Sequence, residues 1–290
     1  MESTVVPYKI VATDLDGTLL NPEHLVSEYT VRVIDALTAK GVPVVFATGR
    51  HHKDVMETKR KLSLKGYLIT SNGACVHDPQ NRPIMEKYIE PSLAKELATL
   101  VADNPDITTN VYRGESWLIN KETDHLSSYS QDNKQVYFSQ LFDPVTEENY
   151  EKVHKLYYTA SRRESLEALF AKLESEYSDK VSYAFALPNC LDVFAKGINK
   201  GFALREVVPI ILGNKGEKND EESALKIKGC IAFGDARNDL EMLSVVEKGC
   251  LMKNAQEDLL KVAPPGLETI GGNFEDGVAK YLAEVFHLDI

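Results

Sequence analysis

The chain has 290 residues, of which 43% are hydrophobic and 27% are charged, the composition of an ordinary globular protein. Its formal net charge of -11 disfavours non-specific binding to nucleic acid, because that binding depends on basic patches. The N-terminus lacks the pattern of a secretory signal, and no run approaches the roughly 20 apolar residues of a membrane helix. We therefore expect a cytoplasmic protein without nucleic-acid or membrane partners, as a monomer or small homo-oligomer.

Five short apolar runs, each followed at once by polar or glycine residues, predict the strands of one sheet. The runs do not alternate with polar residues, which is typical of strands buried on both faces of a parallel sheet. The predicted strands span residues 8–13, 42–47, 66–70, 229–233 and 249–252. Further helices are predicted at 239–248, 255–263 and 275–286. The expected fold class is α/β, with a Rossmann-like doubly wound parallel sheet as its core.

The segment between the first two runs predicts a helix that connects one strand to the next. Val31, Ile34 and Leu37 recur at helical spacing, which indicates one buried face. Ser27 and Gly41 stand where an N-cap and a C-terminal stop are expected. Strand, helix and strand together predict a βαβ unit with a right-handed crossover.

The middle of the chain, residues 84–195, has a different pattern. Two sets of one helix and two alternating strands follow each other, at 92–103, 107–113 and 116–120, and at 163–177, 180–187 and 190–195. We interpret this as an α-β-β repeat that forms an α+β cap domain, inserted after the third strand of the core. The core would then comprise residues 1–83 and 196–290. The polar segment 213–223 predicts a mobile surface loop.

Polar side chains follow the predicted strands at the points where the strands end. They are Asp14 and Asp16 after the first, Thr48 after the second, Ser71 and Asn72 after the third, and Asp235 after the fourth. Ligands of open α/β sheets bind outside the carboxyl ends of the strands, so we expect these side chains to converge there. Core packing does not explain such convergence, because buried carboxylates without partners are costly.

Carboxylates gathered at one sheet edge would repel each other unless a positive group balances them. A hard divalent cation with oxygen ligands is the natural balance, and Mg²⁺ is commonly held by one or two carboxylates, waters and substrate phosphate. Asp14 and Asp235 are the expected carboxylate ligands. The four cysteines form no CxxC pair, and no histidine-cysteine cluster favours zinc.

The sequence motifs resemble those of the haloacid dehalogenase superfamily, and they occur in the family's order over nearly the whole chain. The first, DxDxT, stands at 14–18 within TDLDGTLL. The second lies at Thr48 in VVFATGR, the third at Lys200 in GINKG, and the fourth at Asp235 and Asp239 in GDARND. The SNGA segment at 71–74 and the place of the cap resemble the Cof-like subgroup IIB, and within it bacterial sugar-phosphate and pyridoxal-phosphate phosphatases.

The resemblance and the chemistry of the side chains imply the same catalytic roles. Asp14 would attack phosphorus and form an aspartyl phosphate. Asp16, turned toward the leaving oxygen with the help of Gly17, would act as general acid and then as base, which requires a raised pKa. In the family the backbone carbonyl of Asp16 also binds the metal. Lys200 would balance the charge on Asp14 and on the transferred group.

Other residues are expected to hold the substrate or to orient the metal. Thr48 and backbone N–H groups after Asp14 would hold phosphate oxygens, and Asp239 would orient the metal's ligands together with Asn238. The predicted substrate-binding residues are Leu15, Gly17, Gly49, Arg50, Asn72, Asn189 and Asn238. The expected activity is Mg²⁺-dependent hydrolysis of a small phosphorylated metabolite, such as a sugar phosphate or pyridoxal phosphate.

Two classes of alternative remain open. A phosphomutase or a dehalogenase can share this fold, although a dehalogenase has no need of Asp16 as an acid. A receiver-type signalling module is also doubly wound and has an acidic pocket. In that fold, however, the phosphorylated aspartate follows the third strand, where this chain has Ser71 and Asn72, and the inserted domain has no counterpart.

Overall fold

A computed structural model of the protein describes residues 7–122, 139–213 and 226–290. The chain divides into two compact units, the first formed by Met1–Met85 and Asn199–Ile290 and the second by Glu86–Ile198. Of the surface loop expected at 213–223, all but Gly213 lies outside the described residues. Among the residues that are described, no helix combines the length and the apolar character needed to span a membrane.

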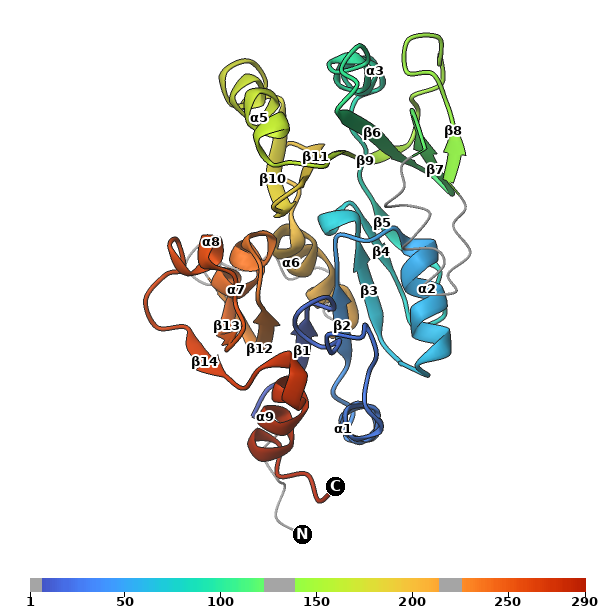
Figure 1. The fold of residues 1–290 in the computed structure, drawn as a ribbon. Helices are drawn as coiled ribbons and strands as arrows, with labels where there is room; N and C mark the ends of the chain where they lie inside the picture. The colour runs from blue at the N-terminus through green and yellow to red at the C-terminus, as the bar shows by residue number, and fades with distance from the viewer. Residues whose placement is uncertain (1–6, 123–138, 214–225) are drawn as a thin grey trace. The chain divides into compact units, whose positions relative to one another are not determined.

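The first unit is built on an eight-stranded sheet with the order β14-β13-β12-β1-β2-β3-β4-β5 (Figure 1). The six strands from β14 to β3 are parallel, and β4 runs antiparallel to β3. The bounds are β1 Ile10–Thr13, β2 Val44–Ala47, β3 Tyr67–Thr70, β4 Cys75–His77, β5 Pro83–Glu86, β12 Ile227–Gly234, β13 Val246–Met252 and β14 Glu268–Ile270.

Helices cover both faces of this sheet because successive strand residues point to opposite sides and both sides are apolar. Val11 of β1 belongs to one buried cluster, whereas Ile10 and Ala12 belong to the other. The first cluster receives side chains from α1 (Glu28–Ala39), α2 (His52–Lys61) and α9 (Gly277–Val285). The second receives them from α6 (Lys200–Ile211), α7 (Leu240–Val245) and α8 (Glu257–Leu260). The predicted doubly wound α/β core is therefore confirmed (Figure 1).

Some elements differ from the sequence prediction. The helix predicted at 239–248 ends at Val245, because Val246 begins β13 and pairs with Ile227 of β12. The second unit does not follow β3 directly, since β4 and β5 come first in the same sheet. The chain reverses between β3 and β4 in a short 3-10 turn, η1 (Ser71–Gly73), whose residues have φ values of 50°, 55° and 101°. Pairing with β12 therefore decided where α7 ends, and a local turn decided where β4 begins.

The second unit has a six-stranded sheet with the order β10-β11-β9-β6-β7-β8. Its strands are β6 Ile107–Arg113, β7 Ser116–Ile119, β8 Ser139–Leu141, β9 Val153–Ala160, β10 Val181–Leu187 and β11 Cys190–Ala195. Helices α3 (Pro91–Thr99) and α5 (Glu164–Glu176) pack their apolar residues into one cluster with this sheet. The two predicted α-β-β sets are present, and β9, which the sequence analysis did not identify, joins their antiparallel hairpins.

Helix α1 illustrates how local signals position an element beside the first strands. The Oγ of Ser27 accepts a hydrogen bond from the N–H of Thr30 at 3.0 Å, which satisfies one donor at the helix N-terminus. Gly41 follows the last turn with φ of 76°, a conformation that glycine adopts at little cost. Val33, Ile34 and Leu37 are buried, so the helix presents its apolar side to the sheet.

Replacing Ser27 by Ala should lower the free energy of unfolding of the first unit by about 1 kcal/mol, because the cap is lost. Ser27→Asp keeps an acceptor at this position and should unfold close to the temperature of the unchanged protein. Thermal unfolding followed by circular dichroism measures both variants. Equal midpoints for the Ala and Asp variants would mean that the cap contributes nothing.

Candidate active site

Three predicted site residues lie at the carboxyl edge of the parallel sheet, each at the position directly after its strand. Asp14 follows β1, Thr48 follows β2 and Asp235 follows β12, and all three are buried. The N–H of Asp14 still donates to the carbonyl of Phe233 at 3.0 Å, so the β1 and β12 pairing extends to the site. The order β12-β1-β2 thus brings together residues that are far apart in the chain.

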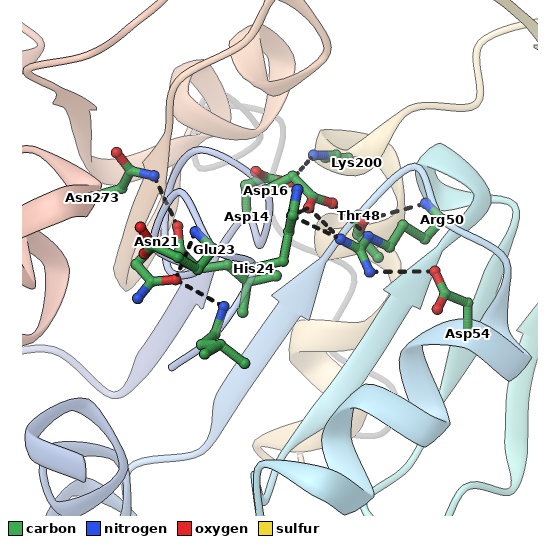
Figure 2. Close-up of polar contacts among 12 residues, drawn as sticks. Asp14, Asp16, Asn21, Glu23, His24, Thr48, Arg50, Asp54, Lys200 and Asn273 are labelled. Carbon is green, nitrogen blue, oxygen red and sulfur yellow. Dashed lines mark hydrogen bonds and ion pairs between the residues drawn. The ribbon is translucent and has the colours of Figure 1, made fainter. Parts of the chain in front are cut away.

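Lys200 is the buried cation of this edge. It is the first residue of α6, and its Nζ lies 2.6 Å from Oδ1 of Asp14 (Figure 2). The same Nζ lies 2.7 Å from Oδ1 of Asp239. Burial by itself would lower the pKa of Lys200, but the two carboxylates outweigh that effect and raise the pKa. Lys200 is therefore charged, and it links the carboxylate that follows β1 with one from the turn after β12.

A second network fixes the carboxylates at the end of β12. Oδ2 of Asp239 accepts the N–H groups of Asp235 and Ala236, both at 3.0 Å, and Oδ1 of Asp235 accepts the hydroxyl of Thr18 at 2.8 Å. One carboxylate oxygen each from Asp14, Asp235 and Asp239 lie within 4.8 Å of one another. Burial, reinforced by Asp239, raises the pKa of Asp235 to about 7. Burial also raises the pKa of Asp14, although Lys200 opposes it.

This group of carboxylates fits a divalent cation. Were all three ionised, Lys200 would offset only one of the three charges, and a second positive group would favour the ionised forms. Asp239 already binds Lys200 and two backbone N–H groups. Among the described residues, Oδ2 of Asp14 and Oδ2 of Asp235 make no hydrogen bond or ion pair. Two buried carboxylate oxygens of this kind suit Mg²⁺ better than a softer metal.

Gly17 stands where no other residue fits. Its φ is 79°, and a Cβ built on it would lie 2.4 Å from Oδ2 of Asp235. The carbonyl of Gly17 accepts a hydrogen bond from the side chain of Asn254 at 2.7 Å. The backbone thus turns sharply after Asp16 and passes against the carboxylate of Asp235, as the DxDxT motif predicted for the turn.

Asp16 departs from the sequence expectation. Its carboxylate accepts hydrogen bonds from Nε of Arg50 at 2.6 Å and from Nη2 of the same side chain, and Nδ1 of His24 lies 3.1 Å away (Figure 2). Burial would raise the pKa of Asp16, but Arg50 and His24 outweigh it and hold the pKa well below its usual range. The raised pKa that we expected for a general acid is therefore wrong for this conformation.

Three further residues of the predicted substrate site, Gly49, Asn72 and Asn238, lie together past the carboxyl ends of β2, β3 and β12. Oδ1 of Asn72 accepts a hydrogen bond from Asn238 at 2.9 Å, and the N–H of Asn72 donates to the carbonyl of Thr48 at 3.1 Å. A Cβ on Gly49 would lie 3.0 Å from Oδ1 of Asn72. Within the described residues, the hydroxyl of Ser71 and Oδ1 of Asn238 are buried and have no hydrogen-bond partner. Buried polar atoms without a partner are rare in folded proteins. The hydroxyl of Ser71 can donate to a phosphate oxygen, whereas Oδ1 of Asn238 can only accept a hydrogen bond.

The structure leaves the roles of two further predicted residues untested. Leu15 follows Asp14 directly; its side chain is buried in the apolar core, and its carbonyl accepts from the N–H of Leu20 at 2.8 Å, so the expected contact of its backbone N–H with phosphate stays a prediction. Asn189 belongs to the second unit, in the turn between β10 and β11, where its carbonyl accepts from the N–H of Ala160. Its contact with substrate stays a prediction.

The sequence analysis missed three residues of this site. Thr18 is the last letter of the DxDxT motif and could have been found there, since the motif alone singles it out. Asn254 and His24 carry no spacing signal, because they reach Gly17 and Asp16 only through the fold.

Comparison with known proteins identifies the family of the chain. A family model described as haloacid dehalogenase-like hydrolase matches residues 11–282. The chain belongs to this family. The resemblance drawn from the motifs is thus confirmed, and the chain is a hydrolase of the haloacid dehalogenase-like family.

Relatives of known name cover nearly the whole chain. A "Putative phosphatase" of Buchnera aphidicola subsp. Schizaphis graminum is 36% identical over 282 residues, 96% of either chain. An "HMP-PP phosphatase" of Yersinia pseudotuberculosis is 34% identical over 280 residues, 95% of this chain and 94% of that one. A crystal structure from Thermotoga maritima has a TM-score of 0.74 at 25% identity and covers 96% of this chain and 97% of that chain.

Replacing Thr18 by Val should weaken Mg²⁺ binding by about tenfold or more, because Asp235 loses the hydroxyl that orients it. Thr18→Ser keeps the donor and is the matched control. Isothermal titration calorimetry with Mg²⁺ measures both variants beside the unchanged protein. An unaltered dissociation constant in the Val variant would show that the hydrogen bond to Asp235 does not support the metal site.

Proposed function

We propose that this hydrolase is a Mg²⁺-dependent phosphomonoesterase that acts on a small phosphorylated metabolite through an aspartyl phosphate on Asp14. The observation that carries the proposal is the buried contact of Lys200 with Asp14 and Asp239 beside Asp235. This arrangement offers a carboxylate nucleophile, a fixed cation and a metal-binding edge in one place. The phosphatase names of the relatives support the same reaction class.

In the first step, an oxygen of Asp14 attacks phosphorus as the bond between phosphorus and the leaving oxygen breaks. Once released from Arg50 and His24, Asp16 would give the proton that neutralises the departing alkoxide, so the products are the aspartyl phosphate and the free alcohol. Lys200 stays beside Asp14 and stabilises the charge that spreads over the transferred oxygens. Thr48 and Asn72 would hold these oxygens in line for attack.

In the second step, Asp16 accepts a proton from a water molecule, which attacks phosphorus and releases inorganic phosphate. Asp14 is thereby restored as a carboxylate, and Asp16 again carries the proton that the next cycle needs. Bound Mg²⁺, held by Asp14, Asp235 and the backbone carbonyl of Asp16, would supply positive charge to the phosphate oxygens. Asp239 and Asn238 would keep these ligands in place.

We propose further that residues 84–195 act as a cap that selects the part of the substrate beyond the phosphate. Asp14, Thr48 and Lys200 would contact only the phosphate, so these three residues do not distinguish one leaving group from another. An enclosed site favours metabolites over phosphoproteins. Sugar phosphates and pyridoxal phosphate are the first candidates. HMP-PP, the substrate in the name of the Yersinia relative, is a further one.

Replacing Asp14 by Asn removes the nucleophile at nearly constant size, so the turnover number should fall by about a thousandfold or more. Asp35→Asn on the exposed side of α1 is the matched control and should retain full activity. Release of inorganic phosphate from p-nitrophenyl phosphate measures both. Retained turnover in the Asp14 variant would remove this residue as nucleophile.

Removing divalent metal with EDTA should stop phosphate release, and added Mg²⁺ should restore it. The physical reason is the excess of buried carboxylates over Lys200, which leaves the phosphate site repulsive to an anion. Thermal unfolding with and without Mg²⁺ provides a readout that is independent of activity. Indifference of both measurements to EDTA would contradict the metal assignment.

A phosphate-release screen tests the reaction and narrows the substrate together. The panel should contain sugar monophosphates, sugar bisphosphates, pyridoxal phosphate and nucleotides. Steady release from a monophosphate, without a bisphosphate activator, is expected of a phosphatase and not of a mutase. Accumulation of a stable phospho-protein without turnover would instead favour a signalling module.

A further inference from the structure

Arg50 is held so that one edge of its guanidinium faces Asp16. Its Nε and Nη2 donate to the carboxylate of Asp16, while its Nη1 donates to Oδ2 of Asp54 on α2 at 3.3 Å (Figure 2). The arginine side chain is only 13% exposed. Because Asp54 binds the opposite edge, Arg50 stays in place if Asp16 turns away, and its Nε and Nη2 edge remains directed at the same spot.

His24 reaches the same carboxylate from a tight turn. Oδ1 of Asn21 accepts the N–H groups of Glu23 and Leu25 at 3.1 Å and 2.8 Å, and the N–H of His24 donates to the carbonyl of Asn21 at 2.9 Å. His24 has a φ of 56°, which few residues other than glycine adopt. The side chain of Asn273, from the C-terminal part of the first unit, donates to the carbonyl of Leu20 and so holds the start of the turn (Figure 2). The turn thus fixes the imidazole at Asp16.

Arg50 and His24 together form a small site built for an anionic group, and the carboxylate of Asp16 is its present occupant. Nδ1 of His24 lies 3.4 Å from Nη2 of Arg50, so both side chains converge on one oxygen of that carboxylate. A planar guanidinium edge binds carboxylate and phosphate oxygens with the same geometry. Another anion can therefore take the place of Asp16.

Asp16 cannot serve the leaving group while it occupies this site. In the proposed mechanism its carboxyl must contact the leaving oxygen, whereas here its oxygens are bound to Arg50 and His24. When Asp16 turns away, these contacts are lost, and Arg50 and His24 have no anionic partner unless another anion takes its place.

We propose that Arg50 and His24 bind a second anionic group of the substrate, a carboxylate or a second phosphate, which displaces Asp16 and frees it for catalysis. The inference rests on the proposed function, because it names the substrate class of that same site. When a metabolite with two anionic groups binds, its second anionic group replaces the carboxylate of Asp16 as the partner of Arg50. A metabolite with a single phosphate leaves Arg50 and His24 without a replacement partner when Asp16 turns.

Matched substrate pairs test the inference. Glycerol 3-phosphate and 3-phosphoglycerate differ in a carboxylate, and fructose 6-phosphate and fructose 1,6-bisphosphate differ in a second phosphate. We expect kcat/KM to be about tenfold to a hundredfold higher for the doubly anionic member of at least one pair. The two pairs also distinguish a carboxylate from a phosphate as the second group. Equal or lower values for both doubly anionic members would overturn the inference.

Two variants connect this preference to the two side chains. His24→Gln removes the imidazole from a 44% exposed position, and Arg50→Lys keeps the charge but loses the planar edge. Each should reduce the ratio of kcat/KM within the preferred pair by several-fold. Arg60→Gln, which removes an exposed arginine of α2 paired with Glu57, should leave the ratio unchanged. An unchanged ratio in both test variants contradicts the role of Arg50 and His24.

Binding without turnover separates this inference from the proposed function. Calorimetry on the Asp14→Asn protein, with the four ligands above, should give tighter binding of the doubly anionic member. Adding Asp16→Asn should increase that preference, because the competing carboxylate is gone. If no phosphate is released from any substrate but this pattern of binding holds, the phosphatase proposal fails and the anion site stands. If phosphate is released but the doubly anionic ligands do not bind more tightly, the anion site fails and the phosphatase proposal stands.

Discussion

The buried contact of Lys200 with Asp14 and Asp239 is the interaction on which the rest of the core site depends. Carboxylates from β1 and from the turn after β12 lie within a few ångströms of each other and away from water. Buried charge of one sign is tolerated only where a partner of opposite sign is fixed beside it. Lys200 fulfils this condition because its backbone begins α6, where Asn199 caps the helix and determines the direction of the chain.

The same constraint explains why fold and site cannot be separated in the first unit. Lys200 and Asp14 are 186 residues apart, and Thr18 and Asp235 are 217 residues apart, yet each pair is in hydrogen-bond contact. The position of β1 between β2 and β12 makes both contacts possible. Gly17 and Gly73 then allow the backbone to approach Asp235 and Asn199 more closely than any side chain would permit.

The sequence predicted most of the core because its signals are local. Strands buried on both faces have uniform apolar runs, and Ser27 and Gly41 delimit α1 by short-range chemistry. The gathering of Asp14, Thr48 and Asp235 at one edge of the sheet was predicted from their positions after the strands and from the motifs. The pairing of Asp16 with Arg50 and His24 did not follow, because it depends on a turn whose conformation only the folded chain defines. The strand β9 was missed for a related reason, since its partners β6 and β11 lie elsewhere in the sequence.

The adjacency of β1 and β12 has a consequence for how the chain is made. Ile10 pairs with Cys230, so the central strand of the first sheet has no partner on one side until the last quarter of the polypeptide has been synthesised. The strands from β6 to β11 all come from one continuous stretch, which is complete earlier. Since contacts that are close in sequence form sooner, the inserted unit should reach its native state on the ribosome before the unit that surrounds it. The N-terminal strands, with their exposed apolar faces, would wait for the C-terminal ones, and this interval is when they are most open to aggregation or to chaperones.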